Sequence, residues 1–140
     1  MSAYERVKVL IADDENHIRL LMKRVMQKCG LDVVGEARDG QEAVDLFDQL
    51  KPDLLLLDIN MPRKTGVEAL EKIRNTYHNA RVIMLTSVSD FDNVQKCISL
   101  GAINYIRKDT SLEEIEKIMK KTCENIQARK EPDRNSQIDA

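Results

Sequence analysis

The sequence predicts an α/β fold in which helices cover both faces of a parallel sheet. Five short apolar runs alternate with stretches of helical spacing along the 140 residues. The third run, Leu54–Asp58, is apolar up to its last residue, as in a strand buried on both faces. Strands that alternate with helices through short connections indicate a parallel sheet, in which each helix makes a right-handed crossover between two strands. A flavodoxin-like (βα)5 three-layer sandwich with strand order 2-1-3-4-5 is therefore expected.

Each strand is recognised from its apolar run and from what bounds it. The first run is rich in β-branched residues and ends at Asp13-Asp14, whereas the leucine run lies between Pro52 and Pro62. Proline disfavours both a central strand position and a continuing helix, so these two residues bound the third strand. The expected strands are residues 7–12, 32–37, 54–58, 81–86 and 103–106.

A helix is expected after each strand, because apolar residues there recur at spacings of three and four. Gly30 and Gly101 end the first and fourth helices. Ser111-Leu112-Glu113-Glu114 fits a capping box and marks the start of the last one. The residues expected to face the core are Ile18, Leu21, Met22, Val25 and Cys29; Ala43, Val44, Phe47 and Leu50; Val67, Leu70 and Ile73; Val94, Cys97 and Ile98; and Ile115, Ile118 and Met119.

Composition favours one soluble domain, residues 1–127, followed by a polar tail, residues 128–140, that is expected to be disordered. The net charge is −2, from 22 basic and 24 acidic residues, which favours neither nucleic acid nor an anionic membrane as partner. No apolar run approaches the ~20 residues of a membrane span. Glu5, Arg6 and Lys8 interrupt any signal-peptide pattern, so a cytoplasmic location is expected.

Reactive residue types follow four of the five predicted strands. Asp13 and Asp14 follow the first, Asp58 ends the third, Thr86 ends the fourth, and Lys108 follows the fifth. Because the carboxyl ends of parallel strands meet at one edge of the sheet, these side chains are expected to converge at a switch point.

Each of these residues also has an ordinary structural interpretation. Asp58 could cap a turn, and Asp13-Asp14 could complement a helix dipole. Thr86 could cap the following helix, while Lys108 could be a solvated surface lysine. The coincidence of all of them at one sheet edge favours a functional site.

The chemistry of such a cluster is that of phosphoryl transfer. Three neighbouring carboxylates repel one another unless a cation neutralises them, and oxygen ligands suit Mg²⁺. Lys108 supplies a point charge and Thr86 a hydroxyl donor for a phosphoryl group. Asp58 is the expected nucleophile, because it stands alone on the central strand while Asp13 and Asp14 form a pair.

With these residues together, the chain resembles the receiver domains of bacterial two-component response regulators over residues 5–127. The matching motifs are Asp13-Asp14, Asp58-Ile59-Asn60-Met61-Pro62 with Gly66, Thr86-Ser87, and Tyr105 with Lys108. The resemblance implies that Asp58 accepts a phosphoryl group from the phosphohistidine of a sensor histidine kinase. Lys108 would hold that group, Thr86 would move toward it, and Tyr105 would change rotamer. The face made by the fourth helix, fifth strand and fifth helix would then switch for partner binding.

The same resemblance implies a metal site for Mg²⁺, with Mn²⁺ as a substitute. Asp14 would bind the ion directly and Asp13 through water. Asp58 and the backbone carbonyl of Asn60 would complete the protein's ligands.

The resemblance also implies partners: a sensor histidine kinase, and a downstream effector protein or output domain. The protein would be a monomer or a phosphorylation-dependent dimer, and it would not itself bind nucleic acid or membrane. It would be no enzyme beyond catalysing its own aspartyl phosphorylation and dephosphorylation. An alternative is the receiver half of a longer DNA-binding regulator. One departure is Asp109, where most members have a proline, often in a cis peptide, after the lysine. A non-proline cis bond costs about 3 kcal/mol, so a trans peptide with a shifted lysine loop is plausible, but the sequence leaves open whether the Lys108-Asp109 peptide is cis or trans.

Two other classes of function fit less well. Phosphatases with an aspartate nucleophile place a second aspartate two residues later as general acid, and Asn60 stands there. A flavin- or nucleotide-binding module would need a phosphate loop after the first strand, where Asp13-Asp14-Glu15 would repel phosphate.

Overall fold

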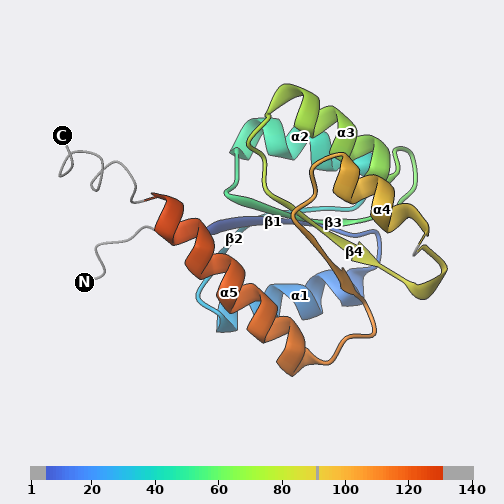
Figure 1. The fold of residues 1–140 in the computed structure, drawn as a ribbon. Helices are drawn as coiled ribbons and strands as arrows, with labels where there is room; N and C mark the ends of the chain where they lie inside the picture. The colour runs from blue at the N-terminus through green and yellow to red at the C-terminus, as the bar shows by residue number, and fades with distance from the viewer. Residues whose placement is uncertain (1–5, 91, 131–140) are drawn as a thin grey trace, which may run out of the picture.

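A five-stranded parallel sheet forms the centre of the molecule in the computed structural model, which describes residues 6–90 and 92–130 (Figure 1). The strand order is β2-β1-β3-β4-β5, which confirms the predicted sheet. The strands are β1 (Lys8–Ala12), β2 (Asp32–Ala37), β3 (Leu54–Asp58), β4 (Val82–Thr86) and β5 (Asn104–Arg107).

Helices cover both faces of this sheet and make three layers (Figure 1). One outer layer holds α1 (Asn16–Lys28) and α5 (Leu112–Lys130). The other holds α2 (Gly40–Leu50), α3 (Gly66–Thr76) and α4 (Asp92–Ser99). A single 3-10 turn, η1 (Val88–Asp90), lies between β4 and α4. This is the flavodoxin-like (βα)5 sandwich expected from the sequence.

The leucine strand β3 divides the core into two halves. Leu55 and Leu57 belong to the apolar cluster under α2, α3 and α4, and Leu54 and Leu56 to the cluster under α1 and α5. Every residue of β3 is buried. Because successive side chains of a strand point to opposite faces, one run of four leucines serves both clusters.

Polar side chains fix where several helices begin. The Thr65 hydroxyl accepts from the Glu68 amide while the Glu68 carboxylate accepts from the Thr65 amide, a capping box at α3 that the sequence reading missed. At α5 the Ser111 hydroxyl accepts from the Glu114 amide at 3.3 Å. This is the serine hydroxyl bond of the predicted capping box. These bonds satisfy amide donors that the first helical turn leaves without partners.

Two details of the prediction were wrong, and a third concerns the chain's last residues. The fourth helix turns Ile98 outward, with 45% of the residue exposed, because Val94 and Cys97 already fill the face toward the sheet. The fifth strand lies one residue later than expected. Helix α5 continues through Lys130, so the first residues of the predicted 128–140 tail are helical, and residues 131–140 lie outside the described part.

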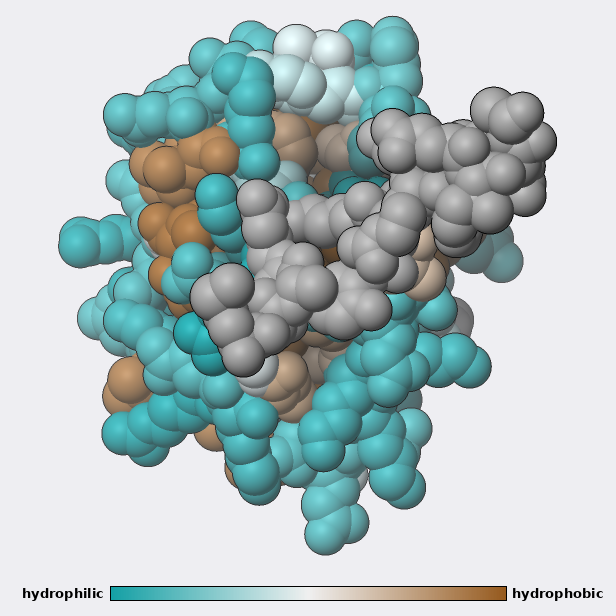
Figure 2. All heavy atoms as spheres, turned by 90° about the vertical axis from the view of Figure 1, so that its left-hand side faces the viewer, coloured by the Kyte–Doolittle hydropathy of each residue, from teal (hydrophilic) through white to brown (hydrophobic). Residues whose placement is uncertain are grey.

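The surface in Figure 2 is mainly hydrophilic, with hydrophobic atoms visible in limited patches among polar side chains. Among the described residues, no helix has both the length and the apolar character that crossing a membrane requires.

Candidate functional site

The ends of four strands meet at one edge of the sheet, and the register aligns them. Ala12, the last residue of β1, pairs with Leu57, and Asp58, the last of β3, pairs with Leu85. Thr86, the last of β4, pairs with Arg107 at the end of β5. Residues that are distant in sequence therefore become neighbours there, as a parallel sheet requires.

Three carboxylates converge at this edge. One oxygen each from Asp13, Asp14 and Asp58 lies within 4.8 Å of the others. Asp13 and Asp58 are buried, whereas Asp14 is exposed at the rim. Two buried oxygens with a third open to solvent form a donor set that suits a hard cation keeping part of its water shell. These residues fit a magnesium ion.

The ammonium group of Lys108 enters the same cluster. Its Nζ lies 2.9 Å from Oδ2 of Asp13, 3.0 Å from Oε1 of Glu15 and 3.1 Å from Oδ2 of Asp58. The backbone amide of Lys108 donates to the Thr86 carbonyl at 2.9 Å, which fixes the start of the lysine loop on β4. The Lys108-Asp109 peptide, which the sequence left open, is trans, since no peptide among the described residues is cis.

Burial and like charge make Asp58 an unusual carboxyl group. Burial, and then the charge of Asp13, raise the pKa of Asp58 from 3.8 to about 7, although Lys108 opposes this. Burial acts to lower the pKa of Lys108, but the bonds to Asp13 and Glu15 and the charge of Asp58 raise it overall. The hydrogen bond from Lys108 lowers the pKa of Glu15. Lys108 therefore stays charged in the cluster.

The backbone around Asp58 is held on both sides. The Asn60 amide donates to Oδ1 of Asp58 at 3.3 Å, and the Gly66 amide donates to the Ile59 carbonyl at 2.8 Å. A β-carbon at Gly66 would lie 1.9 Å from the carbonyl oxygen of Asp58, so α3 can begin this close to β3 only with glycine there. The role of the Asn60 carbonyl as a metal ligand stays a prediction.

The two predicted switch residues lie on the neighbouring strands β4 and β5. Thr86 is fully buried, and its hydroxyl donates to the Ser87 carbonyl at 2.9 Å. Tyr105 lies two residues before the end of β5, paired with Met84 and 37% exposed. Their movement stays a prediction.

Two residues at the site, Glu15 and Arg19, were not predicted from the sequence. Glu15 contacts Lys108, and its amide donates to Oδ1 of Asp13 at 2.9 Å. Arg19 is buried, and its guanidinium donates to the backbone carbonyl of Asp13. A signal for Arg19 was available, because it lies three and seven residues before the buried Met22 and Met26, on the apolar stripe of α1.

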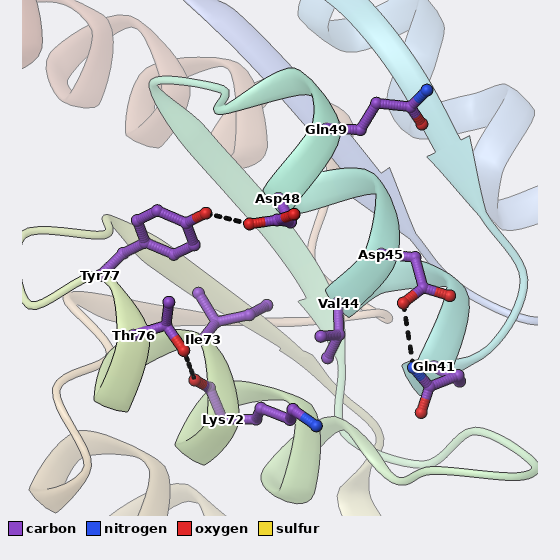
Figure 3. Close-up of a pocket in the computed structure, with 9 residues that line it drawn as sticks. All are labelled: Gln41, Val44, Asp45, Asp48, Gln49, Lys72, Ile73, Thr76 and Tyr77. Carbon is purple, nitrogen blue, oxygen red and sulfur yellow. Dashed lines mark hydrogen bonds between the residues drawn. The ribbon is translucent and has the colours of Figure 1, made fainter.

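A hollow of about 420 Å³ between α2 and α3 is separate from this site. Figure 3 shows Tyr77 reaching across it to hydrogen-bond Asp48, while Asp45 bonds to Gln41 within α2. None of the three clustered carboxylates, Asp13, Asp14 and Asp58, lines this hollow.

Comparison with known proteins agrees with this geometry. The family profile of the response regulator receiver domain matches residues 9–120. The response regulator protein VraR of Staphylococcus saprophyticus is 36% identical over 120 residues, which cover 85% of this chain and 57% of that protein. The chain thus spans little more than half the length of this relative.

Solved structures show the same likeness. The receiver domain of AraT from Geobacillus stearothermophilus superposes with a TM-score of 0.83 at 30% identity, covering 90% of this chain and 99% of that one. CheY of Borrelia burgdorferi, solved in a CheX-CheY-BeF3-Mg complex, gives a TM-score of 0.75 at 29% identity over 79% of this chain and 84% of that one. With its sheet order, its acidic edge and these relatives, the chain belongs to the response regulator receiver domain family of two-component systems.

Proposed function

We propose that Asp58 is the phosphoacceptor of this receiver domain and that a sensor histidine kinase supplies the phosphoryl group. The observation that carries the proposal is the contact between Asp58 and Lys108 inside a cluster of three carboxylates. A nucleophile, a fixed cationic side chain and oxygen ligands for a metal are the parts that phosphoryl transfer needs.

Asp13, Asp14, Asp58 and the Asn60 carbonyl would hold Mg²⁺, or Mn²⁺ in its place. The bound ion would neutralise charge on the carboxylates and on the transferring phosphoryl oxygens. The donor chemistry supports this assignment, because the three carboxylates offer oxygen ligands only. Burial, and then the charge of Asp13, raise the pKa of Asp58, and a bound cation would relieve both effects. The Borrelia CheY, solved with BeF3 and Mg, supports it by analogy.

In the proposed transfer, a carboxylate oxygen of Asp58 forms a bond to phosphorus as the phosphorus–nitrogen bond to the kinase histidine breaks. The electron pair of that bond leaves on the imidazole nitrogen. Lys108 would turn its ammonium from the carboxylates to a phosphoryl oxygen. The domain would thus catalyse only its own phosphorylation and, through water, its dephosphorylation.

The signal would then pass to the face made by α4, β5 and α5. Thr86 would exchange its bond to the Ser87 carbonyl for one to the phosphoryl group, and Tyr105 would change rotamer in the space vacated. A shift from a mostly inactive to a mostly active population needs differential contacts of about 5 kcal/mol. A downstream effector or output domain would read this face, with the protein as a monomer or as a phosphorylation-dependent dimer, in the cytoplasm.

A second candidate is the receiver half of a longer DNA-binding transcriptional regulator. The observation in its favour is that this chain matches only 57% of VraR. In that case an attached domain, rather than a separate protein, would bind the α4–β5–α5 face.

The proposal is tested by incubating the protein with acetyl phosphate and Mg²⁺ and measuring its intact mass. One added phosphoryl group is expected, with none after chelation of the metal and none in Asp58→Asn. The same gain in Asp58→Asn, or no gain in the wild type, would refute the assignment.

A further inference from the structure

Arg19 of α1 is a buried charged residue beside the acidic cluster, and the phosphoryl chemistry leaves it without a role. It is 6% exposed. Its Nη1 donates to the backbone carbonyl of Asp13 at 2.6 Å, and its Nη2 donates to the side chain of Asn16. Burying a guanidinium is costly unless its hydrogen bonds compensate, so such a position calls for an explanation.

The guanidinium joins three elements at one point. It connects α1 with the residue that follows β1, and its Nε lies 3.4 Å from Oε1 of Glu36 on β2. Nε makes this ion pair without a hydrogen bond among the described residues. A planar guanidinium can serve two acceptors and a carboxylate together, which a lysine ammonium on a flexible stem cannot do in the same geometry.

The turn that carries the carboxylates is also held by Lys108, which contacts the side chains of Asp13 and Glu15, and by two backbone amides. The Asp13 amide donates to the Ala37 carbonyl at 3.0 Å, and the Glu15 amide donates to Oδ1 of Asp13. The bond from Arg19 holds the Asp13 carbonyl, the remaining backbone group of that residue. Amide, side chain and carbonyl of Asp13 are then all fixed.

We propose that Arg19 is a positioning residue for the metal site: through the Asp13 carbonyl it sets the direction of the Asp13 and Asp14 carboxylates. The inference rests on the proposed function, since it assumes that these carboxylates bind a cation. Residues that orient metal ligands change metal affinity by about 10- to 100-fold when they are removed.

Charge and positioning predict opposite effects, which makes the inference testable. Removing a positive charge near a cation site should tighten Mg²⁺ binding, because the repulsion between the two cations is relieved. Removing a positioning residue should weaken it. Lys23 provides a matched control: it lies on the same helix and pairs with the same Glu36, at 3.5 Å, and its ammonium is bonded to Glu36 rather than to Asp13.

The experiment measures Mg²⁺ affinity of the full chain by isothermal titration calorimetry. Arg19→Met is expected to raise the dissociation constant about 10- to 100-fold, and Lys23→Met to change it less than about twofold. Arg19→Lys should recover part of the loss, because its ammonium can still donate to the Asp13 carbonyl. Equal or tighter binding by Arg19→Met would overturn the inference.

Hydrogen exchange of the Glu15 amide without metal gives a second readout. That amide bonds to the Asp13 side chain, so Arg19→Met should exchange it several-fold faster, while Lys23→Met should not. If Arg19→Met does not fold, Glu36→Gln replaces it, because the Glu36 side chain is 38% exposed and tolerates change. Removing this negative charge alone would also weaken Mg²⁺ binding, so the readout for Glu36→Gln is exchange of the Glu15 amide. That exchange should be faster than in the wild type, and unchanged exchange would overturn the inference.

Failure of the inference and failure of the proposed function give different results. If the wild type binds Mg²⁺ and Arg19→Met binds it equally well, Arg19 has no positioning role and the proposed function stands. If the wild type binds no Mg²⁺, the proposed metal site fails, whereas the amide exchange still reports whether Arg19 holds the turn.

Discussion

The ammonium nitrogen of Lys108 lies 3.1 Å from Oδ2 of Asp58, although 50 residues separate the two in sequence. The same nitrogen contacts Asp13 and Glu15. The protein thus places its own cation among the carboxylates that are proposed to bind a metal. A metal ion and Lys108 would share these oxygens, so each should influence the other.

Lys108→Met separates metal binding from phosphoryl transfer. Mg²⁺ should bind more tightly, up to about tenfold, because a competing positive charge has left the carboxylates. Labelling by acetyl phosphate should nevertheless be slower, because the phosphoryl oxygens lose their cationic partner. Calorimetry and timed intact-mass spectra measure the two effects. Arg107→Met is the control, since Arg107 pairs with the exposed Asp109, and it should change neither. Faster labelling of Lys108→Met would contradict the role given to the lysine.

The raised pKa of Asp58 makes stability depend on pH in metal-free buffer. The folded protein holds this proton up to a pKa of about 7, whereas the unfolded chain releases it near 3.8. The stabilising contribution is therefore complete below about pH 4 and is lost as pH rises through 7. Asp58→Asn lacks this loss of stability, so its free energy of unfolding should rise relative to that of the wild type by on the order of 4 kcal/mol between pH 4 and pH 8. Urea unfolding at a series of pH values measures the difference, and a constant difference would show that Asp58 titrates normally. Saturating Mg²⁺ should reduce the effect.

Gly66→Ala should be strongly destabilising, because the new methyl group would meet the Asp58 carbonyl at 1.9 Å. A loss of about 3 kcal/mol or more is expected. Gly30→Ala is the matched control: Gly30 has φ of +85°, but its β-carbon would meet nothing within 4 Å. It should cost about 1 kcal/mol through backbone conformation alone. Urea unfolding measures the loss of stability in both variants. A larger loss in Gly30→Ala than in Gly66→Ala would show that backbone conformation matters more than the steric clash with the Asp58 carbonyl.

Thr86→Val should uncouple phosphorylation from the signalling face. Valine keeps the shape of this buried side chain but loses the hydroxyl that now bonds to the Ser87 carbonyl. Labelling should continue, because Asp58 and Lys108 remain, while the NMR shift changes of Tyr105 on phosphorylation should be much reduced. Full changes at Tyr105 in the variant would exclude Thr86 from the switch.

The sheet could be predicted from sequence because its strands carry strong local signals. Four consecutive leucines that end in an aspartate can be buried on both faces only in a central strand, and β3 is that strand. The orientation of Ile98 could not be predicted this way. Its spacing fits an apolar stripe, but short helix α4 offers the sheet only one narrow face, which Val94 and Cys97 fill.

The convergence of the acidic residues followed from topology alone, since parallel strand ends must meet. The contacts of Lys108 with Glu15 and of Arg19 with Asp13 did not follow, because they depend on side-chain rotamers and on how deeply α1 packs. Periodicity places Arg19 near the core but does not reveal which carbonyl its guanidinium meets.

The most direct test of the central claim locates the phosphoryl group itself. After labelling with acetyl phosphate and Mg²⁺, borohydride reduction converts an aspartyl phosphate to homoserine, and peptide mass spectrometry shows which residue has changed. Homoserine at position 58, and at no other aspartate, is the predicted result. Homoserine at Asp13 or Asp14 with Asp58 intact, or none anywhere in a protein that has gained mass, would contradict the account.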